Sequence, residues 1–394
     1  MRRLGRNAKW LLVTEPGWSI PFPWVFFYQP VYVVAVGLSE VEYGVWSSAV
    51  RGASILFPLI AVPVAVRFGF KRSFLVFDAF SNVAFLSAMM VGRREFVILG
   101  MLSNSLLSIS AVLWEILLIE GTDPEALVMA YAVPSVIYTV GNSLTVVAGL
   151  IMERYGVVEG YRVLLSIALA TYLAKTTVLA FELEEPRVDP MRGRESLRHA
   201  VRMLYADKRL LILVLYNVLS SIIFAVFGYL SLYLYDQRGA KLSVEAASLI
   251  PSLSSAVSLA TLAAVSLRPP PSRGTYLALA AVAGSAAYAL YALSPAEPRL
   301  AFAAALLSGV RGAEFSVARA YFLDFLAGVN ASVRGQAISL LYTLSNIISI
   351  PAPAAVGLLY SLHPTCIWLL AMASSLAQLA LLTALARMRE KSCP

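Results

Sequence analysis

Two oppositely charged residues, Arg311 and Glu314, lie near the middle of an apolar stretch that covers about residues 299–323. In a membrane-spanning helix an ionised side chain costs about 2.5 kcal/mol or more, so it is usually paired, hydrated or functional. Side chains three residues apart share a helix face, so these two can form an ion pair. We predict that they form part of a site for a solute or a proton. The alternative is a pair that only neutralises itself where two helices pack.

Other polar side chains inside apolar stretches are candidate solute contacts. Arg51 has no acidic neighbour in the sequence, so it could bind an anionic group or extend toward the water interface. Tyr28 and Gln29 would add an aromatic and an amide contact in the first stretch. Asn142 and Asn346 end a repeated Tyr-Thr-x-x-Asn sequence and could hydrogen-bond a solute, although such residues more often join helices.

Five further ionisable residues lie within or at the ends of apolar stretches. Glu15 and Asp78 are interpreted as interfacial, and the long stem of Lys175 is expected to reach the same interface. Glu115 and Arg319 occupy equivalent places in two stretches, where they could form a gate or extend separately to water.

The reactive residue types argue against an enzyme or a metal protein. Two cysteines and two histidines, which are scattered along the chain, cannot supply a metal cage, a haem site or a disulfide framework. A lipid-modifying enzyme would need a cluster of catalytic side chains at the interface, which these residues do not provide. The sequence also contains no glycine-lysine phosphate loop, which argues against an ATP-driven pump. We expect no cofactor, no metal and no enzymatic activity.

The composition predicts the elements that must hold these side chains. The 394 residues are 59% hydrophobic and 14% charged, whereas soluble domains carry about 25% charged residues. A membrane span takes about 20 mostly apolar residues, and the runs here are too long for strands. The fold class is therefore all-α integral membrane, and the first run could be helical only after Pro23. Twelve spans are predicted at 10–37, 44–66, 73–91, 95–118, 126–151, 161–183, 209–235, 244–266, 275–293, 299–323, 333–360 and 364–387.

The distribution of lysine and arginine predicts the orientation. These residues concentrate in the predicted loops of one side and in both terminal segments, which places both termini in the cytoplasm. Topology thus accounts for the net charge of +8, and no nucleic-acid partner is expected.

The chain divides near its middle. A polar stretch separates a first six-helix bundle at 1–185 from a second at 209–394, and the linker at 186–208 could carry a short surface helix. Shifting the first bundle so that Asn142 meets Asn346 also superposes the predicted helices. This indicates two pseudo-symmetric copies of one unit.

The pattern of six helices, a charged loop and six helices resembles the major facilitator superfamily over nearly the whole chain. The loop after the second predicted span is similar to the main signature of that family. Arg67, Gly69 and Lys71 match it, whereas Val66 replaces an aspartate that takes part in the family's charge latch. Asp324 and Arg334 resemble another inner loop of the family.

This resemblance implies a secondary transporter that moves a small solute by alternating access, with a proton as a candidate co-substrate. Glu115, Arg319, Asp324 and Arg334, together with the signature loop, would then be gating candidates. The few buried carboxylates and several arginines favour an anionic or neutral polar solute. A multi-pass monomer in the cell membrane is expected. The alternative is a receptor or assembly factor that keeps the transporter fold without transport.

Overall fold

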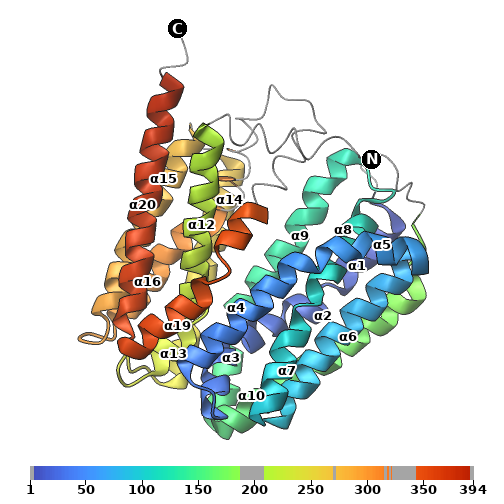
Figure 1. Ribbon diagram of the computed structural model, residues 1–394, viewed down its shortest axis with the longest axis horizontal. Helices are drawn as coiled ribbons and strands as arrows, with labels where there is room; N and C mark the ends of the chain where they lie inside the picture. The colour runs from blue at the N-terminus through green and yellow to red at the C-terminus, as the bar shows by residue number, and fades with distance from the viewer. Residues whose placement is uncertain are drawn as a thin grey trace. The chain divides into compact units, whose positions relative to one another are not determined.

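The computed structural model describes residues 4–186, 208–268, 272–314, 317–318, 321 and 343–390. Within these ranges all regular elements are helices, which confirms the predicted all-α class (Figure 1). Arg319, Asp324 and Arg334, and nearly all of the predicted linker, lie outside the described residues.

The chain forms two compact units. Unit 1 contains residues 1–190 and 243–252, and unit 2 contains residues 191–242 and 253–394. The helices of unit 1 are α1 (Arg6–Thr14), α2 (Pro16–Ser19), α3 (Pro21–Ala35), α4 (Glu40–Leu56), α5 (Pro58–Phe68), α6 (Phe70–Val91), α7 (Arg94–Asn104), α8 (Leu107–Ile119), α9 (Pro124–Ser143) and α10 (Thr145–Glu182).

Unit 2 is also built from helices, and the first residues of α14 cluster with unit 1. The elements are α12 (Lys208–Phe227), α13 (Leu230–Tyr235), α14 (Val244–Leu267), α15 (Arg273–Leu293), α16 (Leu300–Gly309), the 3₁₀ helix η1 (Val310–Ala313), α19 (Ala352–Leu362) and α20 (Thr365–Glu390).

Prolines determine where several spans are broken. Pro16, Pro21 and Pro58 begin α2, α3 and α5, at positions where the missing N–H has no helical partner to lose. The bend between α4 and α5 measures 49°. The expected helix start after Pro23 is wrong, because the chain is already helical from Arg6.

Helix length and composition support a membrane protein. Within the described residues, seven helices are long and apolar enough to cross a bilayer, or eight if α4 and α5 form one bent span. Two shorter apolar helices cover Leu211–Phe227 and Leu300–Ala313. Large apolar side chains such as Phe181 and Leu279 are exposed, as lipid-facing positions require.

Each unit has its own packed interior. In unit 1, Leu11, Phe74, Leu113 and Leu179 bring together α1, α6, α8 and α10. In unit 2, the buried cluster includes Leu213, Leu277 and Leu385, from α12, α15 and α20. Because lipid is as apolar as these side chains, close packing and interhelical hydrogen bonds stabilise such bundles. The two interiors position the polar side chains described below.

Candidate functional site

Arg311 and Glu314 form the predicted ion pair inside unit 2. Nε of Arg311 lies 2.5 Å from Oε2 of Glu314, and Nη2 lies 2.9 Å from Oε1. The two side chains are only 12% and 13% exposed. This two-point contact between guanidinium and carboxylate is the strongest form of such a pair.

A local break in the helix positions the pair. Arg311 lies in η1, which directly follows α16. A 3₁₀ turn leaves helical backbone groups without their usual partners, and Tyr276 of α15 supplies them. Its hydroxyl donates to the carbonyl of Val310 at 2.9 Å and accepts from the N–H of Ala313 at 3.2 Å. Ser258 of α14 donates to the carbonyl of Gly309 at 3.2 Å. The backbone irregularity is therefore held by side chains from two neighbouring helices.

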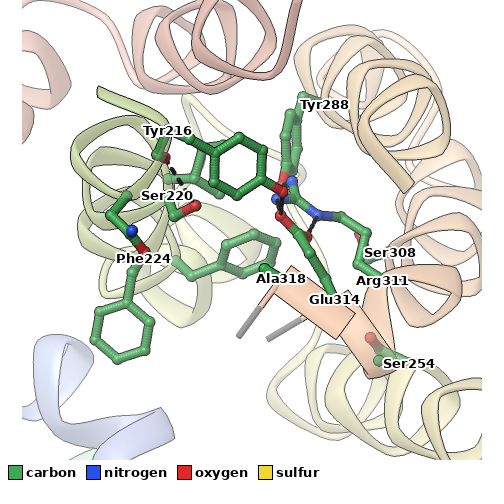
Figure 2. A pocket seen from close by; sticks show the side chains of 13 residues that line it. Tyr216, Ser220, Phe224, Ser254, Tyr288, Ser308, Arg311, Glu314 and Ala318 are labelled. Atoms are coloured by element: carbon green, nitrogen blue, oxygen red, sulfur yellow. Dashed lines mark hydrogen bonds and ion pairs between the residues drawn. The ribbon is translucent and has the colours of Figure 1, made fainter. Parts of the chain in front are cut away.

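Side chains from α12, α15 and α20 complete the surroundings of the pair, and Figure 2 shows Tyr216 and Tyr288 beside it. Tyr288 of α15 accepts a hydrogen bond from Nη1 of Arg311, and the guanidinium carbon lies 5.6 Å from its ring centre. Tyr216 of α12 donates to Oε1 of Glu314 at 2.6 Å. Gln378 of α20 accepts a longer contact from Arg311 at 3.5 Å and donates to Ser220 at 2.7 Å.

A cavity of about 310 Å³ opens beside this network. Such a volume is typical of small-molecule sites. Its walls combine aromatic rings, hydroxyls, an amide and one balanced ion pair, so they carry no net charge (Figure 2). The lining residues are Tyr216, Asn217, Ser220, Ile223, Phe224, Phe227, Ser254, Tyr288, Ser308, Arg311, Gly312, Glu314 and Ala318.

A buried aromatic layer supports one wall of this cavity. Trp368 of α20 is fully buried and stacks on Tyr291 with ring centres 4.3 Å apart. Phe227 meets the same indole edge-on at 5.7 Å. Aromatic contacts of this kind are worth about 0.5–1.5 kcal/mol each beyond the area that they bury. Phe227 also meets Tyr288 edge-on at 5.9 Å, so the layer packs against both rings that line the cavity.

The remaining candidate contacts do not line this cavity. Arg51, Tyr28, Gln29 and Asn142 belong to unit 1, and Asn346 is exposed in unit 2. Tyr28 is 2% exposed and donates to the carbonyl of Val244 at 3.2 Å. The Asn142 carbonyl accepts from Thr145 at 2.7 Å. In the part of the chain that the structure describes, the Arg51 side chain has neither an ion pair nor a hydrogen bond.

The gating candidates that the structure describes are exposed on helices or lie at the turn between two helices. Glu115 is exposed and accepts a hydrogen bond from Tyr131 at 2.9 Å. Arg67 is exposed, and its guanidinium lies 5.3 Å from the ring centre of Phe68. Gly69 has a φ of +91°, a conformation that favours glycine. This turn connects α5 to α6.

The signature loop of unit 1 has an acidic partner that the sequence analysis missed. Glu185, which follows α10, accepts a hydrogen bond from the N–H of Phe70 and another, at 3.1 Å, from the N–H of Lys71. These N–H groups begin α6, where a carboxylate is favoured by unpaired donors and the helix dipole. A Cβ at Gly69 would lie 3.1 Å from this carboxylate. A carboxylate therefore contacts this loop although Val66 replaces the family's aspartate.

Unit 1 contains a second buried group of charged residues. Glu15, Asp78 and Lys175 are 6%, 7% and 8% exposed, and Lys175 Nζ lies 3.6 Å from Glu15 Oε2. The prediction that Lys175 extends to the interface is wrong, because its ammonium pairs with Glu15 inside the unit. The interfacial interpretation of Glu15 and Asp78 stays a prediction. The carboxylate that holds Lys175 comes from another helix, at the break between α1 and α2.

Sequence reasoning also missed Tyr216, Tyr288 and Gln378. Each is a polar side chain inside an apolar stretch, which is the signal that could have found them. Their convergence on Arg311 depends on how three helices pack, and spacing within one helix carries no such information.

Comparisons with known proteins agree with this architecture. The family model of the Major Facilitator Superfamily matches residues 17–353. A search of curated proteins found no match to this sequence. Among solved structures, the nucleoside transporter NupG has a TM-score of 0.73 and 15% identity, and the match covers 96% of this chain and 98% of that one.

Two other solved transporters are similar in fold. A D-xylose–proton symporter has a TM-score of 0.69 at 12% identity, covering 94% of this chain and 96% of that one. A bacterial homologue of the human lysosomal transporter Spinster, in an inward-facing conformation, has a TM-score of 0.66 at 14% identity. That match covers 97% of this chain and 96% of the other. The sequence match and the helical architecture together show that this chain is a secondary transporter that belongs to the Major Facilitator Superfamily.

Proposed function

We propose that the cavity beside Arg311 and Glu314 is the solute site of this transporter and that it takes an uncharged polar molecule. The observation that carries this proposal is the two-point ion pair inside the cavity wall. Because Glu314 already neutralises Arg311, a solute with a net charge would enter an apolar region without a counter-charge. An uncharged solute avoids that desolvation cost.

The groups that remain available suit a molecule with hydroxyls and a planar or hydrophobic face. Asn217 offers its amide oxygen, because its amide nitrogen already donates to the Leu213 carbonyl at 3.0 Å. Ser254 offers a hydroxyl, and Phe224 and Phe227 offer ring surfaces. Phe224 is 75% exposed, so its ring is open to contact. The similar structures include a nucleoside transporter and a D-xylose symporter, whose solutes are uncharged polar molecules. These two classes are the first to test.

Binding would act through the same hydrogen bonds that hold the pair. Tyr216 donates to Glu314 and Tyr288 accepts from Arg311, so a solute hydroxyl can replace either phenol without leaving a charge unpaired. Alternating access then requires the site to face each side of the membrane in turn. We also propose that the protein is a monomer of the cell membrane with both termini in the cytoplasm, and that a proton accompanies the solute.

The deciding test is the double variant Arg311→Met with Glu314→Met, because it removes both charges and leaves no lone buried charge. The purified variant is assayed in proteoliposomes for uptake of radiolabelled uridine and D-xylose. We expect the wild type to take up at least one of them. Loss of charge-assisted contacts worth about 1.5–3 kcal/mol should slow uptake about ten- to hundredfold in the variant.

A matched pair controls for the substitution itself. Glu297 and Arg299 also form a pair, with 4.0 Å between charged atoms, but their side chains are 57% and 93% exposed. Methionine at both of these positions should leave uptake within about twofold, since exposed pairs contribute about 0–1 kcal/mol. Wild-type uptake by the folded Arg311→Met/Glu314→Met protein would show that the pair is only structural. Uptake of the corresponding phosphates in preference to uridine or D-xylose would contradict an uncharged solute.

A further inference from the structure

The buried charges of unit 1 differ from those of unit 2 in their balance. Arg311 and Glu314 are matched one to one. The second group has two carboxylates, Glu15 and Asp78, and one ammonium, Lys175. All three line a cavity of about 230 Å³ within unit 1. With every member ionised, the group would carry one uncompensated negative charge in an apolar environment.

The hydrogen bonds show which carboxylate lacks a counter-charge. Glu15 has Lys175 on Oε2 at 3.6 Å and accepts from Ser19 on Oε1 at 2.5 Å. Asp78 contacts only uncharged donors in the described residues: Tyr172 at 2.8 Å on Oδ2 and Asn82 at 3.4 Å on Oδ1. Neutral donors stabilise a buried carboxylate less than a cation does.

We propose that Asp78 is a proton-binding site, which takes a proton from the water of the cavity and releases it there. Uptake converts the carboxylate to a carboxylic acid, and the net charge of the group changes from minus one to zero. At about 30 Å³ per molecule, the cavity has room for several waters that could carry the proton. This inference does not depend on the solute site proposed above, because all of its residues belong to unit 1.

The other groups around Asp78 do not change this charge balance. From α10, Lys175 and the neutral phenol of Tyr172 face it, and Glu15 faces it from the break before α2. From α8 and α9, the cavity is lined by uncharged side chains such as Trp114, Ser110 and Pro134. The charged residues of the other two helices packed on α6 lie outside the cavity lining: Arg67 of α5, and Arg94 and Glu95 of α7.

A proton fits the site better than a sodium ion. Hard cations need several oxygen lone pairs directed at them. The oxygens of Asp78 instead accept an O–H and an N–H, and Asn82 uses its own side-chain oxygen to accept from Trp18 at 3.3 Å. In the ranges that the structure describes, no group of three or more His, Cys, Asp or Glu side chains could hold a metal ion.

Infrared difference spectroscopy of the full-length protein in lipid bilayers tests this proposal. Spectra are compared between about pH 9 and pH 5, a range that spans the protonation of a buried carboxylate. The protonated carboxyl band should grow as the pH falls. Labelling aspartate with ¹³C should shift this band, whereas labelling glutamate should not. The label distinguishes aspartate from glutamate without any variant, and the variants then identify which of the six aspartates carries the proton.

Two matched variants locate the proton. Asp78→Asn leaves the balanced Glu15–Lys175 pair, so the band should be lost. Glu15→Gln combined with Lys175→Gln removes that pair and leaves the charge of Asp78, so the band should remain. Glu314→Gln, in the other unit, should leave it unchanged. A band that survives in Asp78→Asn, or that shifts only with labelled glutamate, overturns the proposal. So does a band that is lost at constant pH when sodium chloride replaces choline chloride.

Discussion

At Gly284, a Cβ atom would lie 2.7 Å from Nη1 of Arg311 and 3.0 Å from its Cδ. Real Cβ atoms do not approach other atoms that closely, so the guanidinium can lie against α15 because residue 284 has no side chain. The hydrogen bond to Tyr288 and the contact with Glu314 depend on this placement. The site therefore requires the absence of a side chain at Gly284 as much as it requires the charged side chains of Arg311 and Glu314.

This placement predicts the effect of Gly284→Ala. The guanidinium is the free end of a long side chain, so it can move aside, and the melting temperature should fall by only a few degrees. The displaced charge no longer meets Tyr288 and Glu314 together. Uptake in proteoliposomes should drop about tenfold, which corresponds to a loss of about 1.4 kcal/mol. The control is Gly274→Ala in the first turn of the same helix, where the nearest atom is the Tyr321 hydroxyl, at 3.3 Å. Equal uptake by the two variants would contradict the role of Gly284.

The ion pair of unit 2 could be predicted from sequence because both residues lie in one helical stretch, three positions apart. Its partners Tyr216, Tyr288 and Gln378 could not, because they come from α12, α15 and α20. Lys175 is a second residue whose partner could not be predicted from its own helix. A long stem within one helix predicts an extension to water, but the carboxylate of Glu15 on another segment offers a closer counter-charge.

At the level of the helices, η1 interrupts a membrane span at the position of the Arg311–Glu314 ion pair. A regular helix pairs each carbonyl with an N–H four residues later, and the 3₁₀ turn disrupts this pattern. The hydroxyl of Tyr276 serves Val310 and Ala313 at once. A single phenol on α15 thus stabilises the backbone shape that presents Arg311 and Glu314.

Tyr276→Phe tests this role of the hydroxyl. Leaving a buried carbonyl and N–H without a partner costs about 1–3 kcal/mol, so the free energy of unfolding should fall by that amount. The measurement is denaturant unfolding of the purified protein in detergent. Tyr235→Phe is the control, since that side chain is 39% exposed, and it should change stability by less than about 0.5 kcal/mol. Equal stability of the two variants would mean that other groups support η1.

The sequence predicted the positions of the helices better than it predicted the breaks within the spans. Apolar runs place the spans of α6, α14, α15 and α20 within a few residues of their observed ends. The helix start expected after Pro23 was wrong, because Pro16 and Pro21 do not end the helical path. Proline ends a helix only when its missing N–H matters. Because Pro16 and Pro21 are the first residues of α2 and α3, the chain stays helical through both positions. The 3₁₀ helix η1 could not be predicted from the sequence, because Tyr276, which stabilises it, is on a different helix.

For the whole molecule, the match to the Major Facilitator Superfamily supports two related bundles that alternate in access. The predicted superposition of residues 10–183 on 209–387, with Asn142 on Asn346, remains a prediction. The predicted bundle boundaries at 185 and 208 also remain predictions. Orientation is a separate property, because the same bundles could insert either way. Only the charge of the loops favours one insertion, with the positive loops in the cytoplasm.

The two ends of α6 provide a test of orientation within a single helix. Its 22 residues rise about 33 Å at 1.5 Å per residue, enough to cross a hydrocarbon core of about 30 Å. Arg72 is exposed at the start of this helix, and Arg93 is exposed just after its end. Both are arginines, so replacing either by cysteine makes the same change of charge. Each variant is made with the native Cys366 and Cys393 replaced by serine.

We expect a membrane-impermeant maleimide to label Arg93→Cys in intact cells and Arg72→Cys only after the membrane is opened. The physical reason is that Arg67, Lys71 and Arg72 form a basic loop at one end of α6, and positive loops are retained in the cytoplasm. The reverse pattern would place both termini outside and contradict the charge argument. Labelling of both cysteines in intact cells would mean instead that α6 does not cross the membrane. In that case the apolar environment assigned to Asp78 would have to be abandoned as well.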